Sequence, residues 1–242
     1  MTLLSIVQDH CRVYALNIPT SVIGSQDTSV AQLLGLLNNL VENLIDENNW
    51  QAFTQEALWT MIPGEDQGTF TTDILPDTGF LWAANGTFWD RTLRRPLYGP
   101  VTDVEWQALK AIPNPGPWYK YRIRGDHFLI NPAPTVGNLS EISFEYATSF
   151  AVKSSDGVLR PVFQADTDTS ILPEKILKQG LAYRWKELKG LPYQPEMDRY
   201  YNMLNNYIAR DGTKRVYRLD GANNWDVRPG IFVPSGNWPV NN

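Results

Sequence analysis

Helical signals lie near both ends of this 242-residue chain, with strand and turn signals between them, and this order constrains the fold most strongly. Apolar residues recur every three or four positions over Val30–Ile45, which predicts a helix with one apolar stripe. Two further helices are predicted over Pro173–Lys189 and Pro195–Arg210, and each begins with proline, a favoured first helical residue. Because apolar stripes must be buried, the separated helices are expected to meet in one bundle.

A shorter helix is predicted ahead of the long one, over Leu3–Leu16. Thr2 is its expected N-cap, and Asn17-Ile18-Pro19 is its expected end, because the residue before a proline is pushed out of the helical region. The start of the long helix is expected to be capped by Asp27, Thr28 or Ser29. The bundle therefore takes helices from both ends of the chain.

The middle of the chain shows the two-residue period of half-buried strands. Apolar and polar residues alternate over Tyr119–Arg124 and over Glu141–Tyr146, and Gly125-Asp126 is expected to turn the chain into another strand over His127–Asn131. Val104–Ala111 is expected to add one or two helical turns. Further turns are predicted at Pro63-Gly64, Pro76-Asp77 and Asn85-Gly86. We interpret this region as a small, mainly antiparallel β-domain.

The predicted fold class is therefore α+β, with an antiparallel-type helical bundle built from both chain ends. Residues 1–58 and 165–212 are assigned to the bundle, and residues 59–164 to the inserted β-rich domain and a polar return linker. Residues 213–242, which are rich in proline, glycine, aromatic and basic residues, are predicted to form an extended C-terminal arm.

Composition limits the class of protein. A net charge of −5, from 21 basic and 26 acidic residues, argues against broad wrapping of nucleic acid, which needs a basic surface. The single cysteine, Cys11, excludes an internal disulfide framework and a multi-cysteine zinc site, and is expected to be a buried small hydrophobe. No signal peptide and no apolar run long enough to span a bilayer are recognised, so a soluble protein without a membrane anchor is expected.

No catalytic, cofactor-binding or metal-binding site is predicted. His10 and His127 are far apart and lack metal-site spacing, so structural roles are favoured, although a triad assembled from distant residues stays open. Asp166 and Asp168 lack the further oxygen ligands and the glycine of a calcium loop, which favours a polar turn with an aspartate capping the following helix. Glu65-Asp66 is likewise interpreted as a turn rather than as a glycosidase acid.

Basic and aromatic residues interleave in the C-terminal arm. This pattern fits either base stacking or the arginine and tryptophan anchors of a protein interface, and the acidic net charge favours the interface. A disordered tail is the remaining alternative, but three large apolar side chains argue against a purely solvating segment. The residues predicted to bind a partner are Arg215, Tyr217, Arg218, Trp225, Arg228, Phe232 and Trp238.

The order of several motifs resembles the head–tail adaptor proteins of short-tailed phages, of the tail tubular protein A type. Leu16-Asn17-Ile18-Pro19 before the long helix and Asn49-Trp50-Gln51-Ala52-Phe53 after it are similar to the opening of that family. Gly86-Thr87-Phe88-Trp89-Asp90-Arg91-Thr92 resembles its hairpin. Phe128–Pro132, Phe144–Tyr146 and the helix from Leu172 to Lys186 are similar to further elements, so the likeness covers residues 1–212 and leaves the arm outside it.

This resemblance implies a structural virion protein rather than an enzyme. The expected assembly is a ring of twelve copies that binds beneath the dodecameric portal protein and offers a platform to the tail nozzle protein. DNA would pass through its lumen only as cargo during genome ejection, past an acidic wall that repels phosphates. The expected location is the head–tail junction of the virion, with assembly in the host cytoplasm.

The resemblance also suggests roles for parts of the chain. The bundle is expected to make the ring and its portal side, and the β-domain to face the tail. The hairpin residues Trp89, Asp90 and Arg91 are expected to face the tail or a neighbouring subunit. The arm is expected to dock on the portal or on an adjacent subunit, with its arginines pairing with acidic partners.

Two other functions remain as alternatives. Nine tryptophans and several loop carboxylates motivate a carbohydrate-binding module or a weak cell-wall hydrolase of a phage tail, although neither explains the helices. Single-stranded nucleic-acid binding is disfavoured by the net charge of −5.

Overall fold

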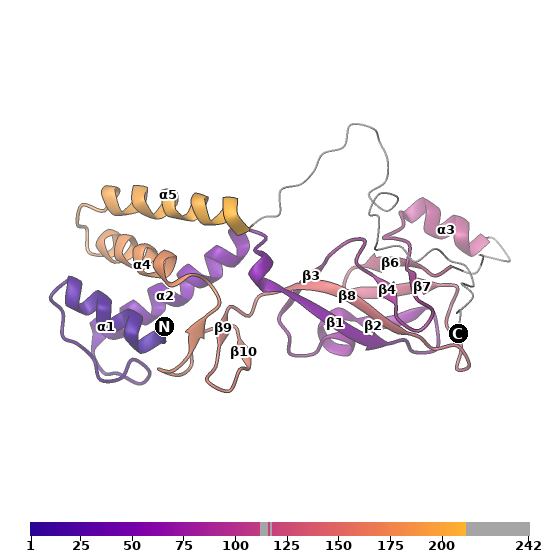
Figure 1. Cartoon of the computed structure of the whole chain (residues 1–242), viewed down its shortest axis with the longest axis horizontal. Coiled ribbons are helices and arrows are strands. Elements are labelled where there is room, and N and C mark those ends of the chain that lie inside the picture. Colours follow the sequence, from indigo (N-terminus) through magenta and orange to yellow (C-terminus); the bar gives the residue numbers. More distant parts are fainter. Residues whose placement is uncertain (112–115, 117, 212–242) are drawn as a thin grey trace, which may run out of the picture. The chain divides into compact units, whose positions relative to one another are not determined.

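The computed structural model describes residues 1–111, 116 and 118–211, and the predicted order of helices and strands is present in it (Figure 1). It combines helices with small antiparallel sheets, which confirms the α+β class. The predicted C-terminal arm lies outside the described residues. The four helices of the bundle are α1 (Leu3–Val13), α2 (Thr28–Glu47), α4 (Glu174–Leu188) and α5 (Gln194–Asp211).

Thr2 caps α1 as predicted, and Asp27 is the one of the three candidate residues that caps α2. The Thr2 hydroxyl accepts a hydrogen bond from the Ser5 backbone N–H at 3.4 Å, and an Asp27 carboxylate oxygen accepts one from the Ser29 N–H at 2.8 Å. Helix α1 ends at Val13 rather than at the predicted Leu16, because Ala15 adopts a left-handed φ of 52°. The Leu16 N–H then donates to the Cys11 carbonyl at 2.9 Å, which closes the helix end.

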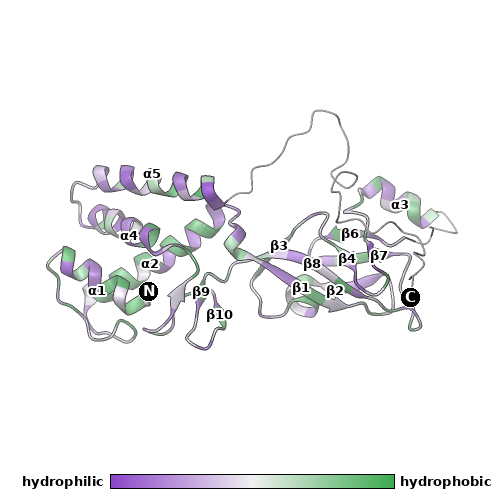
Figure 2. Ribbon diagram, in the orientation of Figure 1, coloured by the Kyte–Doolittle hydropathy of each residue, from purple (hydrophilic) through white to green (hydrophobic). Residues whose placement is uncertain are grey.

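The core of the bundle is mostly aliphatic and joins helices from both ends of the chain. Hydrophobic and hydrophilic positions are mixed along each helix, as expected for helices with one buried face (Figure 2). Helix α4 approaches α2 closely at Gly180, where an added Cβ would lie 2.6 Å from a methyl carbon of Leu40. Buried aliphatic residues of this core include Leu3, Ile6, Val7, Leu33, Leu37, Leu40, Leu44, Leu177 and Leu181.

The largest sheet of the β-rich region is built on β8 (Glu141–Thr148). Strand β1 (Thr54–Thr60) pairs with β8 in one unbroken antiparallel register, from Thr54 opposite Ala147 to Thr60 opposite Glu141. The other side of β8 pairs with two shorter strands in succession, β3 and β4, and β4 pairs in turn with β5. Their bounds are β3 (Phe80–Ala83), β4 (Trp89–Asp90) and β5 (Arg95–Pro96).

A second antiparallel sheet has the order β2–β7–β6. Its strands are β2 (Asp66–Thr69), β6 (Lys120–Arg124) and β7 (His127–Asn131), and Gly125 turns β6 into β7 with a positive φ of 62°. Helix α3 (Asp103–Ala111) buries Trp106 and Leu109 against Leu129 of β7. The region also contains a short 3-10 helix, η1 (Gln51–Phe53), and a single π-helical turn, η2 (Phe70–Ile74).

Aromatic side chains fill the core between these strands. Phe88 lies at the centre, with its ring centroid 4.4 Å from that of Tyr121, 5.1 Å from that of Phe128 and 4.7 Å from that of Phe144. Phe70 adds a stacked contact with Phe80 at 4.6 Å. This aromatic core is a different cluster from the aliphatic core of the bundle.

The segment predicted to be a polar return linker forms a third small sheet. Strands β9 (Val152–Lys153), β10 (Leu159–Arg160) and β11 (Thr169–Ser170) pair in the order β10–β9–β11, and Val152 and Phe163 belong to the core of the bundle. Two-residue strands leave no periodic pattern, which explains why the sequence did not reveal them. The division of the chain into an inserted domain and a bundle stays a prediction.

Asp166 and Asp168 stabilise turns, but the prediction that one of them caps the next helix is wrong. Helix α4 has Pro173 at its N-cap and no side-chain cap. Asp166 instead accepts hydrogen bonds from the backbone N–H groups of Val22 and Ile23, at 2.9 and 3.0 Å. Asp168 accepts two from Gln164 and Ala165, both at 2.8 Å. Asp166 therefore joins the turn before α2 to the turn before β11.

Candidate interaction surfaces

The two histidines occupy different environments, and each has a structural explanation. His10 is buried in the bundle, with its ring centroid 4.5 Å from that of Tyr14 and 5.6 Å from that of Trp185. Burial lowers the pKa of His10 to about 4, so its ring is neutral at physiological pH. His127 is exposed, and its Nδ1 lies 3.0 Å from a carboxylate oxygen of Asp66. Within the described ranges, no three His, Cys, Asp or Glu side chains gather closely enough to hold a metal ion.

Asp90 of the predicted hairpin has a structural role. Its side chain is only 1% exposed, and its carboxylate accepts a hydrogen bond from the Leu93 N–H at 2.7 Å, which fixes the turn between β4 and β5. Trp89 is half-buried and pairs with Pro96 of β5 and Ser143 of β8. These two residues therefore position the hairpin on β8.

Arg91 follows the hairpin strand and reaches across the sheet. Its Nε donates to the Ser143 hydroxyl of β8 at 2.7 Å, and its Nη2 forms an ion pair with Glu56 of β1. The Arg91 side chain remains 54% exposed, so its guanidinium keeps a surface that another chain could contact. Of the three predicted hairpin residues, it is the one with most exposure.

The outward face of this sheet is acidic, and we call it the acidic sheet face. It consists of Glu56, Leu58, Arg91, Glu141 and Glu145, all exposed. Glu56 lies directly opposite Glu145 in the register of β1 and β8, an arrangement that like charges disfavour. Leu58 is 59% exposed beside them. Sequence patterning did not identify this face, because the register that brings the carboxylates together is known only from the paired strands.

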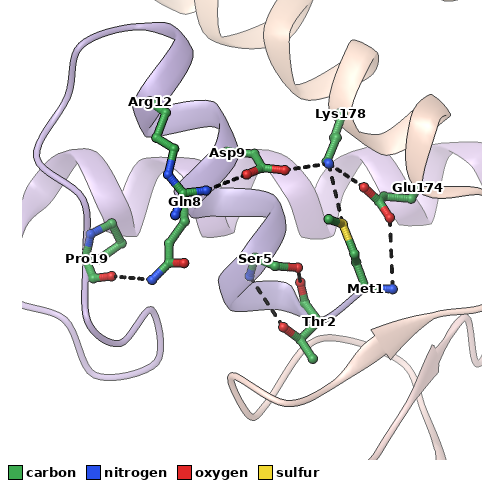
Figure 3. Close-up of polar contacts among 9 residues, drawn as sticks. All are labelled: Met1, Thr2, Ser5, Gln8, Asp9, Arg12, Pro19, Glu174 and Lys178. Atoms are coloured by element: carbon green, nitrogen blue, oxygen red, sulfur yellow. Dashed lines mark hydrogen bonds and ion pairs between the residues drawn. The ribbon is translucent and has the colours of Figure 1, made fainter.

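A cluster of ion pairs joins α1 to α4 (Figure 3). Lys178 Nζ lies 2.6 Å from a carboxylate oxygen of Asp9 and also pairs with Glu174, one turn earlier on α4. Arg12 Nη1 contacts the other Asp9 oxygen at 2.7 Å. The hydrogen bond from Lys178 is the largest cause of the lowered pKa of Asp9, and the hydrogen bond to Asp9 is the largest cause of the raised pKa of Lys178. The cluster links α1 to α4 at the surface of the bundle.

A shallow groove of about 510 Å³ lies beside β3. Leu81 and Trp82 on its wall are 43% and 42% exposed, and Asn85 and Asp126 add polar groups. An exposed indole next to polar groups is the kind of surface that the carbohydrate-binding alternative requires.

The predicted partner-binding residues of the arm lie outside the described residues. They are Arg215, Tyr217, Arg218, Trp225, Arg228, Phe232 and Trp238. Within the part of the chain that the structure covers, no helix has the length and apolar character needed to cross a membrane.

Comparison with known proteins identifies the class. A family described as SU10 adaptor protein matches residues 1–226, which include the bundle, the β-rich region and the first residues of the arm. No curated protein matches the chain. The family match indicates a phage head–tail adaptor. The tail tubular type of short-tailed phages is a narrower class, which the match does not specify. The chain belongs to the SU10 adaptor protein family, and it is therefore a structural adaptor of a phage virion.

Proposed function

We infer that this adaptor forms a ring at the head–tail junction, which docks beneath the portal and presents a platform to the tail nozzle. The observation that carries the proposal is the family match, which runs from residue 1 to residue 226. Within this class we propose the tail tubular adaptor type of short-tailed phages, with twelve copies around the DNA channel. Assembly in the host cytoplasm and a role in genome ejection follow from this position.

The charge of the chain suits a channel through which DNA slides. The net charge is −5, so a ring of copies would repel phosphates rather than bind them. A grip on DNA needs clusters of lysine and arginine that release counterions on binding. DNA is therefore proposed as cargo that passes through the lumen and not as a ligand.

Each part of the chain is proposed to make its own contact in the ring. The bundle forms the ring and its portal side, and the β-rich region faces the tail. Arg91, which keeps 54% of its side chain exposed, is the hairpin residue proposed to reach the tail or a neighbouring subunit. The arm docks on the portal or on an adjacent copy, with Trp225, Phe232 and Trp238 as apolar anchors. No catalytic step is proposed for any of these residues.

Co-sedimentation with purified portal rings tests the portal contact. The full chain should sediment with the rings, and deletion of residues 213–242 should weaken this binding while the melting temperature stays within a few degrees. A deletion that lowers the melting temperature as much as a core substitution would show that the arm belongs to the fold. A full chain that binds neither the portal nor the nozzle would refute the adaptor proposal.

The groove beside β3 keeps carbohydrate binding as a second candidate, because Trp82 is 42% exposed there. Soluble peptidoglycan fragments should quench the fluorescence of this indole if the candidate is right, and Trp82→Ala should abolish the change. The neighbouring substitution Leu81→Ala, which retains the indole, is the matched control. If the fragments leave the fluorescence of the full chain unchanged, carbohydrate binding in this groove is ruled out.

A further inference from the structure

We propose that the outer edge of β1 receives an additional β-strand from a second copy of this chain, and that Lys214–Leu219 supplies it. The proposal rests on the ring proposed above and names one contact between neighbouring copies. It depends on three features: the unpaired edge of β1, the charge of the acidic sheet face, and the alternating pattern of Lys214–Leu219.

The direction of the backbone groups of β1 follows from the register. The Met61 N–H donates to the Ser140 carbonyl at 2.9 Å, so residue 61 and every second residue before it direct their backbone groups toward β8. On the opposite side of β8, the Glu141 and Glu145 carbonyls accept from Arg91 and Ala84, both at 2.8 Å. The residues of β1 whose N–H and C=O groups point away from β8 are Thr54, Glu56, Leu58 and Thr60.

Apart from the charge of Glu56, this edge lacks the usual protection against pairing. Strand β1 spans seven residues, Thr-Gln-Glu-Ala-Leu-Trp-Thr, without lysine, proline or a bulge, and its register with β8 is regular throughout. It stands at the end of the strand order β1–β8–β4–β5, so no described strand pairs with its outer side. Natural proteins normally blunt such edges, and a long regular edge is a template for another strand.

The chemistry of the face selects the strand that can bind. Residues of β1 with outward backbone groups also carry their side chains on the acidic sheet face, because both properties alternate with the same period. An added strand would therefore meet Leu58, which is 59% exposed, with Glu56 on one side and Thr60 on the other. Glu56 has Glu145 opposite it, and Thr60 has Glu141. An aliphatic residue flanked by two cations is the matching pattern.

Lys214–Leu219 has this pattern, although it lies outside the described residues. Lys214, Val216 and Arg218 alternate with Arg215, Tyr217 and Leu219, so one face of an extended segment would carry a cation, a valine and a cation. Antiparallel pairing with Val216 opposite Leu58 would place Arg218 opposite Glu56. The same register would place Lys214 opposite Thr60, next to Glu141. Antiparallel pairing is slightly more stable per residue than parallel pairing. We therefore propose that the strand from the second copy runs antiparallel to β1.

Disulfide trapping in the full chain tests the pairing. Leu58→Cys and Val216→Cys are combined in a Cys11→Ala background and oxidised over a range of protein concentrations. Residues directly opposite in a sheet have Cα atoms about 5.5 Å apart, which a disulfide can span. A ladder of covalent dimers and higher oligomers that grows with concentration is expected. Absence of the ladder, or a cross-link within single chains, would overturn the proposal.

Two controls sharpen the result. Leu58→Cys with Tyr217→Cys moves the second thiol to the other face of the strand, so an equally strong ladder from that pair would contradict the register. In the original trapping pair, Arg218→Glu should lower the yield about fivefold, as for loss of an exposed ion pair, and Glu56→Arg should restore it. Imaging the wild-type chain on portal rings separates the two proposals, because rings without a ladder would refute only the strand exchange.

Discussion

The helical bundle and the β-rich region are stabilised by cores of different chemistry. The bundle buries aliphatic side chains that recur along α1, α2 and α4, such as Leu33, Leu37 and Leu40. The β-rich region buries stacked aromatic rings around Phe88, supplied by strands that are far apart in the sequence. An aliphatic stripe is a property of one helix, whereas an aromatic cluster exists only after several strands have paired. The first can be predicted locally, and the second depends on topology.

The largest expected effect comes from emptying the aromatic core. Phe88→Ala removes a fully buried ring in contact with three others and should lower the free energy of unfolding by about 3–5 kcal/mol. Leu37→Ala is the matched change in the bundle and should cost about 2–5 kcal/mol. Urea unfolding measures both.

Hydrogen exchange shows whether the two cores unfold separately. If the β-rich region unfolds separately from the bundle, Phe88→Ala should remove protection from the paired strands β1 and β8 while α2 and α4 keep theirs, and Leu37→Ala should do the reverse. Loss of protection everywhere in both variants would show instead that the two cores unfold as one cooperative unit.

Lowering the pH should destabilise the bundle, because the buried His10 resists protonation in the folded state. Its pKa is lowered to about 4 by burial, whereas a histidine in the unfolded chain titrates near about 6.5. As the pH falls from 6.5, the unfolded state binds the proton first, so stability decreases until the pH passes the folded pKa, by about 3 kcal/mol in total. His10→Phe should flatten this part of the pH profile, measured by urea unfolding at successive pH values. His127→Gln, at the exposed histidine, should leave it unchanged, and a profile that follows His127 instead would contradict the assignment.

Replacing glycine by alanine should change the stability of the bundle in opposite directions at Gly180 and Gly35, because only Gly180 lies where α4 packs closely on α2. At Gly180 an added Cβ would lie 2.6 Å and 2.9 Å from the two methyl carbons of Leu40, so Gly180→Ala should destabilise the bundle by about 1–3 kcal/mol. At Gly35 of α2 an added Cβ meets nothing within 4 Å, so Gly35→Ala should stabilise it by up to about 1 kcal/mol through helix propensity. Thermal melting compares the two, and an equal shift of the same sign would refute the packing argument.

The smallest effect is expected at the ion pairs between α1 and α4. Asp9→Asn removes the partner of Lys178 and should cost less than about 1 kcal/mol, because the pair is partly solvated and screened by salt. The lowered pKa of Asp9 means that its contribution is present above the ordinary carboxyl range and disappears as the pH falls through the folded pKa. The raised pKa of Lys178 has the opposite sense, so that contribution disappears as the pH rises through the folded pKa. Asp46→Asn on the exposed face of α2 is the control. An equal fall in melting temperature in both variants would show that the ion pair of Asp9 with Lys178 adds no stability of its own.

The parts of the fold that are encoded locally can be predicted from the sequence. They include the four bundle helices, the cap at Thr2, a cap for α2 among Asp27, Thr28 and Ser29, and the hairpin across Gly125, because periodicity, capping and turn chemistry act over a few residues. The sheet of two-residue strands that includes Val152 and Leu159 leaves no such local signal, and the aspartate cap predicted for α4 is absent. Those features depend on contacts between distant segments, such as Asp166 with Val22.

The interaction surfaces divide in the same way. The basic and aromatic pattern of the arm is visible in the sequence, but its binding site is not. The acidic sheet face exists because β1 pairs with β8 in a register that places Glu56 opposite Glu145, and Arg91 reaches Glu56 from β4. Neither contact has a signal in local periodicity, so the surface became recognisable only from the paired strands.

Cryo-electron microscopy of portal rings mixed with the full chain tests whether this protein docks on the portal as a ring. An added ring of this protein is expected on the side of the portal that faces the tail, with an open channel along its axis. Portal particles that remain bare at saturating concentrations of a folded, monodisperse chain would contradict it.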